Sequence, residues 1–148
     1  MISGFEHNAV VRPLETLKNT RNVSVKTARA PLFEPEMLLK AFDEAITDET
    51  KLAVCTHISN VFGYILPIRA LDELCYARGV PLIIDASQSA GAAEINFGEL
   101  KAARFLCCPG HKGLYGPQGT GVLICRDAEA ATLIEGGTGG TALCAACT

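Results

Sequence analysis

The sequence contains no tryptophan, and aromatic residues occupy only 6% of its 148 positions. A hydrophobic core must therefore be built mainly from small and branched aliphatic side chains. Neither sign of charge is in large excess. The formal net charge is −3, which gives no reason to expect a nucleic acid or an anionic membrane as a partner. The hydrophobic share of 49% and the chain length are typical of one globular domain with one core.

Long apolar runs and a secretion signal are missing as well. No stretch approaches the roughly 20 apolar residues that a helix needs to span a bilayer. The N-terminus lacks the basic, apolar and small-residue regions of a signal peptide. These absences predict a cytoplasmic protein that does not interact with a membrane.

Cysteine is the exception to this scarcity, with seven in the chain. An odd number without a secretion signal favours reduced thiols over disulfides. Cys144 and Cys147 form a CxxC pair, but no second ligand pair accompanies it, so a zinc site is not expected there. Four cysteines in apolar runs are predicted to be buried as small hydrophobic side chains: Cys55, Cys107, Cys108 and Cys125.

Short apolar runs alternate with helical patterns along the chain. Runs that are continuously apolar are typical of strands buried on both faces, as in parallel sheets. The predicted strands are 52–55, 81–84, 105–108 and 121–125, with a weaker one at 23–25. The predicted helices are 8–18, 35–42 and 67–78, the last ending at Gly79. This alternation predicts an α/β fold of three layers, in which helices flank a mainly parallel sheet.

Both ends of the sequence read as cuts through a larger domain. Residues 1–3 are typical of the end of a strand, and after Glu135 a glycine-rich loop leads into a tail of small residues. We expect residues 1–137 to form part of a large domain and residues 138–148 to be an unstructured tail.

Polar residues follow three of the predicted strands, where open α/β sheets bind their ligands. These segments are 56–60 (Thr-His-Ile-Ser-Asn), 85–88 (Asp-Ala-Ser-Gln) and 109–112 (Pro-Gly-His-Lys). Together they bring a carboxylate, an amide and a lysine to one edge of the sheet. That set fits pyridoxal 5′-phosphate (PLP), whose aldehyde needs a lysine and whose ring nitrogen needs an anionic partner. Its phosphate needs hydroxyls, backbone N–H groups or cations.

The segment 109–121 (Pro-Gly-His-Lys-Gly-Leu-Tyr-Gly-Pro-Gln-Gly-Thr-Gly) resembles the lysine signature of class V, fold-type I PLP enzymes. It is most similar to the branch of cysteine desulfurases and selenocysteine lyases. Residues 6–9 (Glu-His-Asn-Ala), 57–60 (His-Ile-Ser-Asn) and 85–88 match the same family in order and spacing. Each motif alone is weak evidence for the family, but four motifs in the same order are a specific resemblance. The resemblance covers about residues 1–137 and implies part of the large PLP-binding domain.

The resemblance implies a role for each matching residue. Lys112 would form the Schiff base with PLP, and Asp85 would pair with the pyridinium nitrogen. Gln88 would reach the phenolic oxygen, and Asn60 would lie near the same side of the cofactor. Each residue also has an ordinary alternative: Lys112 as a surface lysine, Asp85 as a helix N-cap, and Gln88 as a solvated loop residue.

Two histidines have implied contacts with the cofactor. His7 would stack on the pyridine ring, in position to assist proton transfer, although a core or helix-start histidine is its alternative. His111 would contact the phosphate. His57 matches the family motif and is assigned a structural role only. Pro109 departs from the family pattern, because it stands where a serine usually supplies a hydroxyl to the phosphate.

The activity that the resemblance implies is that of a cysteine desulfurase. PLP would labilise L-cysteine, an enzyme thiolate would attack its sulfur, and alanine and an enzyme persulfide would result. The implied partners are the amino-acid substrate, a second copy in a homodimer, and a sulfur-acceptor protein. The alternatives are another class V activity, such as an aminotransferase or a selenocysteine lyase, or a truncated product without activity.

Several functional parts of the family have no counterpart in the sequence. The acceptor cysteine and the arginine that binds the substrate carboxylate lie later in family members, and Cys144 and Cys147 come too early to match that cysteine. The Gly-Thr phosphate loop lies upstream of the segment that matches residues 1–7. We therefore expect the 148-residue chain to be catalytically incomplete by itself.

Overall fold

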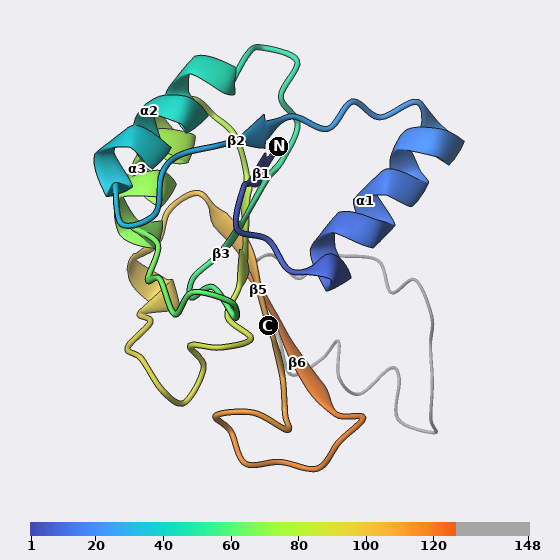
Figure 1. The fold of residues 1–148 in the computed structure, drawn as a ribbon, viewed down its shortest axis with the longest axis vertical. Helices are drawn as coiled ribbons and strands as arrows, with labels where there is room; N and C mark the ends of the chain where they lie inside the picture. Colours follow the sequence, from blue (N-terminus) through green and yellow to red (C-terminus); the bar gives the residue numbers. More distant parts are fainter. Residues whose placement is uncertain (127–148) are drawn as a thin grey trace.

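The computed structural model describes residues 1–126, which form a six-stranded sheet with helices on either side (Figure 1). The strand order is β2-β1-β3-β4-β5-β6. Strands β1 to β5 pair in parallel, and β6 is antiparallel to β5. The predicted α/β fold with a mainly parallel sheet is confirmed. The strands are β1 (Ile2–Ser3), β2 (Thr27–Ala28), β3 (Ala53–Thr56), β4 (Leu82–Asp85), β5 (Ala103–Pro109) and β6 (Gly121–Cys125).

The predicted helices are also present. They are α1 (Asn8–Arg21), α2 (Pro35–Ala45) and α3 (Ile68–Ala77), with a 3₁₀ turn η1 (Phe97–Glu99) before β5. Helices α2 and α3 lie together on one side of the sheet, and α1 lies on the other (Figure 1). Helix α3 ends as predicted, because Gly79 follows it with a φ of 65° that favours glycine.

The core lies between the sheet and the pair α2 and α3. Its largest fully buried side chains are aliphatic apart from one phenylalanine, as the scarcity of aromatic residues predicts. Helix α1 contributes no buried residue to this core. The largest of these buried apolar side chains are Phe42, Leu38, Leu66, Leu71, Leu82 and Ile84.

A buried carboxylate ties α3 to the start of β5. Asp72 is only 2% exposed, and its carboxylate accepts hydrogen bonds from three successive backbone N–H groups. Lys101 donates at 2.6 Å, Ala102 at 3.0 Å and Ala103 at 2.7 Å. The charge therefore satisfies donors that would otherwise be left without partners where β5 enters the sheet.

The weak strand predicted at 23–25 is wrong. Residues 22–26 have no regular structure, and the strand next to β1 is β2, at Thr27–Ala28. The reason is one of pairing: β1 has only two residues, and these are aligned with Thr27 and Ala28. The preceding valines have no strand beside them with which to form a ladder.

The predicted burial of β6 is wrong as well. All five of its residues are exposed, because β6 is the edge strand and no element within residues 1–126 covers it. Cys125 is therefore exposed rather than buried, and Cys107 is half-buried, whereas Cys55 and Cys108 are buried as predicted. All of the described cysteines are free. The predicted tail at 138–148, with its CxxC pair, lies outside the described residues.

None of the helices in the described part has both the length and the apolar character that a membrane crossing demands.

Candidate functional site

The polar residues predicted to follow the strands do lie at one edge of the sheet. Thr56 is aligned with Asp85 between β3 and β4, and Asp85 is aligned with Cys107 between β4 and β5. Because these strands are parallel, their carboxyl ends point the same way. Strand β5 runs on to Pro109 and into the turn that carries Lys112.

Asp85 is held at this edge with one oxygen occupied. The residue is 5% exposed, and its Oδ1 accepts a hydrogen bond from the Ser87 N–H at 2.8 Å. Within residues 1–126, Oδ2 accepts no hydrogen bond. The segment that follows is a series of turns and not a helix, so the alternative of a helix N-cap is wrong. Asp85 thus offers one carboxylate oxygen to a cationic partner.

The turn that carries Lys112 packs against the turn that follows Asp85. A Cβ atom on Gly113 would lie 2.3 Å from the backbone oxygen of Ala90, and one on Gly91 would lie 2.2 Å from the oxygen of Gly113. Only glycine permits such an approach of two backbones. This contact brings Lys112, one residue before Gly113, beside the segment that begins at Asp85. The Lys112 side chain is half-buried and makes no hydrogen bond or ion pair with the described residues.

Other glycines shape the same loop. The predicted conformational role of Gly119 is confirmed by its φ of 82°, and Gly116 donates its N–H to the oxygen of Gly110 at 2.7 Å. Gly121, by contrast, has only an ordinary contact at 3.4 Å. The sequence reasoning missed Gly91 and Gly113, because the turn against which each packs is distant along the chain.

His7 lies between β1 and α1 and caps the helix. Its side chain is exposed, and Nδ1 accepts a hydrogen bond from the Ala9 N–H at 3.1 Å. The alternative of a helix-start histidine is therefore confirmed. Because Nδ1 is an acceptor, the proton of the neutral ring lies on Nε2.

The remaining predicted residues lie in turns near this edge. Asn60 is exposed in the turn after β3, Gln88 is half-buried in the turn after Asp85, and His111 is exposed just before Lys112. No hydrogen bond or ion pair among the described residues joins these three side chains to Asp85. His57 is 6% exposed, and its backbone N–H donates to the backbone oxygen of Asp85 at 2.9 Å. Burial lowers the pKa of its imidazole, which suits the predicted structural role.

Glu6 belongs to the same edge and was missed. Its Oε1 accepts hydrogen bonds from the Ser3 hydroxyl and from the Thr56 N–H, the latter at 2.8 Å, while Oε2 is buried without a partner in the described part of the chain. Burial raises the pKa of Glu6 to about 7, and the charge of Asp85 adds to this rise. The available signal was a carboxylate three residues after the end of a strand and beside His7.

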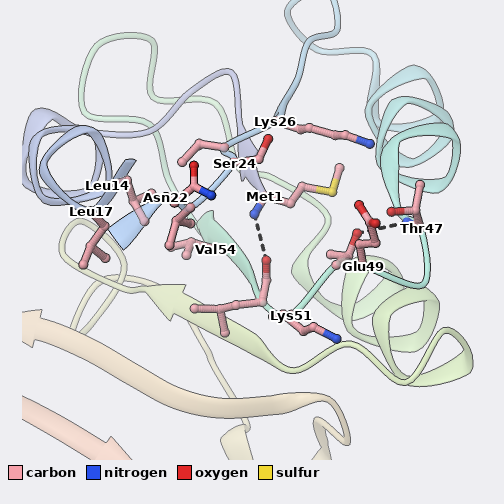
Figure 2. A pocket seen from close by; sticks show the side chains of 14 residues that line it. Met1, Leu14, Leu17, Asn22, Ser24, Lys26, Thr47, Glu49, Lys51 and Val54 are labelled. Atoms are coloured by element: carbon pink, nitrogen blue, oxygen red, sulfur yellow. Dashed lines mark hydrogen bonds between the residues drawn. The ribbon is translucent and has the colours of Figure 1, made fainter. Parts of the chain in front are cut away.

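A cavity lies elsewhere in the described part of the chain. Its volume is about 470 Å³, and its lining includes Met1, Lys26, Lys51 and Leu52 at the amino ends of the strands, with Leu14 and Leu17 of α1 (Figure 2). The Met1 amino group donates to the Leu52 oxygen at its wall (Figure 2). None of the predicted site residues lines it. The chemistry-bearing groups are at the opposite end of the sheet.

The sequence is similar to those of known proteins. The family model described as "Aminotransferase class-V" matches residues 1–145. A cysteine desulfurase IscS from Actinobacillus succinogenes is 38% identical over 121 residues, which are 82% of this chain and 29% of that protein. A probable cysteine desulfurase from Methanothermobacter thermautotrophicus is 31% identical over 128 residues, which are 84% of this chain and 30% of that protein.

Solved structures of cysteine desulfurases and similar proteins also superpose on this chain. The apo structure of a cysteine desulfurase from Thermococcus onnurineus superposes with a TM-score of 0.69 at 30% identity, over 85% of this chain and 31% of that one. SspA in complex with cysteine superposes with a TM-score of 0.74 at 26% identity, over 92% and 39%. The chain spans about 30% of the length of the curated relatives. Because the family model matches nearly the whole sequence, the chain belongs to the aminotransferase class-V family.

Proposed function

We propose that this chain supplies the cofactor-binding core of a PLP-dependent cysteine desulfurase, which converts L-cysteine to L-alanine and passes the sulfur to an enzyme thiol. The observation that supports the proposal is that Asp85 and the turn carrying Lys112 lie at the same edge of the sheet. Asp85 is buried with one carboxylate oxygen open among the described residues, and the glycine contact holds the Lys112 turn against the turn that follows Asp85.

The residues at this edge fit PLP. A buried carboxylate with a free oxygen suits a cationic ring nitrogen, because a charge-assisted hydrogen bond would satisfy it. A half-buried lysine without an ion pair is available to hold the aldehyde carbon covalently. Gln88 follows Asp85 within one turn and would donate to the phenolic oxygen. When bound, PLP supplies an electron sink for the bond that is broken in the substrate.

The other residues would orient the ring and its phosphate. His7 would stack on the ring, and the hydrogen bond at its Nδ1 fixes the imidazole and leaves Nε2–H free to move a proton. His111 would contact the phosphate, and Asn60 would flank the ring from the turn after β3. Pro109 has neither a hydroxyl nor an N–H to offer, so the phosphate would depend on groups other than this position.

The partners of the whole protein follow from the same proposal. They are L-cysteine, a second copy in a homodimer, and a protein that accepts the sulfur. The free thiols of the described residues support the cytoplasm, a reducing compartment, as its location.

The test joins a labelling experiment to a product assay. Full-length protein is incubated with PLP, reduced with borohydride and mapped by mass spectrometry; we expect the pyridoxyl group on Lys112. Lys112→Arg should abolish the label, and Lys101→Arg is the matched control that should keep it. A label on Lys51 or Lys101 contradicts the assignment. With L-cysteine and reductant, equal amounts of alanine and sulfide support desulfuration, whereas a keto acid product would indicate an aminotransferase.

A further inference from the structure

Glu6 has a buried oxygen that the proposed function does not explain. Its carboxyl group lies where β1 and β3 end, and the two donors at Oε1 come from these two strands: the Ser3 hydroxyl and the Thr56 N–H. Oε2 is buried and has no hydrogen-bond partner among residues 1–126. A buried carboxylate oxygen without a donor is costly as an anion, so it requires either a proton of its own or a nearby positive charge.

The charged groups around Glu6 determine whether its carboxyl group is protonated or ionised. Asp85 comes from β4, Cys55 from β3 and Cys107 from β5, and the electrostatic interaction of each with Glu6 is repulsive when both are charged. Burial raises the pKa of Cys107 to about 11 and that of Cys55 well above its usual value, so both thiols are neutral at physiological pH. Thr56, whose N–H donates to Glu6 Oε1, is aligned with Asp85 in the neighbouring strand, so among the described residues Asp85 is the carboxyl group that lies near Glu6 and repels its charge.

Two carboxyl groups at one buried edge are not easily ionised together. Burial favours the neutral form of Glu6, and repulsion from an Asp85 carboxylate without a counter-charge adds to this. A cation on Asp85 would remove this repulsion and add an attraction, and it would favour the ionised form. Ionised Glu6 would then accept stronger, charge-assisted bonds from Ser3 and Thr56, which tie the segment before His7 to β3.

We propose that Glu6 is a positioning residue coupled to Asp85: it is a neutral carboxylic acid while Asp85 is unpaired, and it releases its proton to solvent when a cationic ring nitrogen binds Asp85. The inference rests on the proposed function, because the cationic ring is that of PLP. In this way cofactor binding would tighten the connection that places His7.

The first measurement needs no cofactor. The ¹³C resonance of the Glu6 carboxyl group is titrated in the apo protein and in Asp85→Asn. We expect a midpoint near neutrality in the wild-type protein and a lower midpoint in Asp85→Asn, because a repelling charge has been removed. A midpoint that is the same in both proteins overturns the coupling, and this comparison leaves Glu6 itself unchanged.

The second measurement counts protons. PLP is titrated calorimetrically into wild-type protein and into Glu6→Gln, in two buffers of different ionisation enthalpy, between pH 6 and 9. At pH 7, where Glu6 is about half protonated, we expect the wild-type protein to release more protons than the variant, by up to about half a proton per site. The difference should vanish toward pH 9, where Glu6 is already ionised.

The outcomes separate the two proposals. If PLP binds and labels Lys112 in both proteins but the proton counts agree at every pH, the role of Glu6 is refuted and the proposed function stands. If PLP does not bind to the wild-type protein, the proposed function fails, and the carboxyl titration alone decides whether Glu6 and Asp85 are coupled.

Discussion

Replacing Gly113 by alanine would test whether the contact between two turns positions Lys112. The added Cβ would lie 2.3 Å from the Ala90 oxygen, whereas real Cβ atoms stay at least 3.0 Å from such neighbours. The obstructing atom belongs to backbone, so the turn must move by roughly 0.7 Å or more. Misplacement by about 1 Å costs on the order of 10²-fold in rate. We expect Gly113→Ala to lower kcat/KM for the proposed formation of alanine from L-cysteine by about 10- to 100-fold, while the protein remains folded.

The assay follows covalent attachment of PLP by absorbance, together with alanine formation from L-cysteine. Gly121→Ala is the matched control, since its Cβ would meet only an ordinary contact at 3.4 Å, and its rates should stay near wild type. Circular dichroism and a urea titration establish that both variants are folded. If folded Gly113→Ala attaches PLP and turns over cysteine at wild-type rates, then this contact does not position Lys112.

Three further predictions concern stability and reactivity. Asp72→Ala should lower the free energy of unfolding in urea by about 3 kcal/mol or more, because it leaves the N–H groups of residues 101–103 without an acceptor. Asp72→Asn should lower it by less. A loss under about 1 kcal/mol in Asp72→Ala would contradict this prediction. The pKa of Glu6 is raised from 4.5 to about 7 by burial, so native apo protein binds this proton more tightly than unfolded protein does. Stability should therefore fall by up to about 3 kcal/mol as the pH rises through that window, and Glu6→Gln should flatten the profile measured in urea. A thiol reagent should modify exposed Cys125 quickly and buried Cys55 slowly, and equal rates would argue against the burial described.

Local patterns were sufficient to predict the helices and most of the strands. The apolar spacing of 35–42 and 67–78 predicts amphipathic helices, and both are present because each buries that face in the core. The strand expected at 23–25 failed since pairing depends on β1, which is distant in sequence and aligned with Thr27–Ala28. β6 was correctly placed but wrongly expected to be buried, because coverage is decided by other elements and not by its own residues.

The candidate site was predictable to a similar degree. Asp85 and Lys112 could be found because Asp85 ends β4, Lys112 lies in the turn after β5, and parallel strands end at the same edge. The packing of their two turns could not, because it depends on the contact of Gly91 with Gly113. Glu6 escaped notice for a related reason: its unusual protonation arises from burial and from Asp85, and neither is visible in the motif around it.

The exposed edge strand has a practical consequence for handling the chain in solution. Val122, Leu123 and Ile124 of β6 are 43%, 62% and 42% exposed, and within residues 1–126 the outer backbone of β6 pairs with no strand. An apolar strand with open hydrogen-bonding groups is a template for another strand. The rate at which a sample aggregates should then depend on protein concentration, and not on temperature alone. The substitution Leu123→Lys would place a charge on this strand and raise solubility, without changing the sheet edge that carries Asp85 and Lys112.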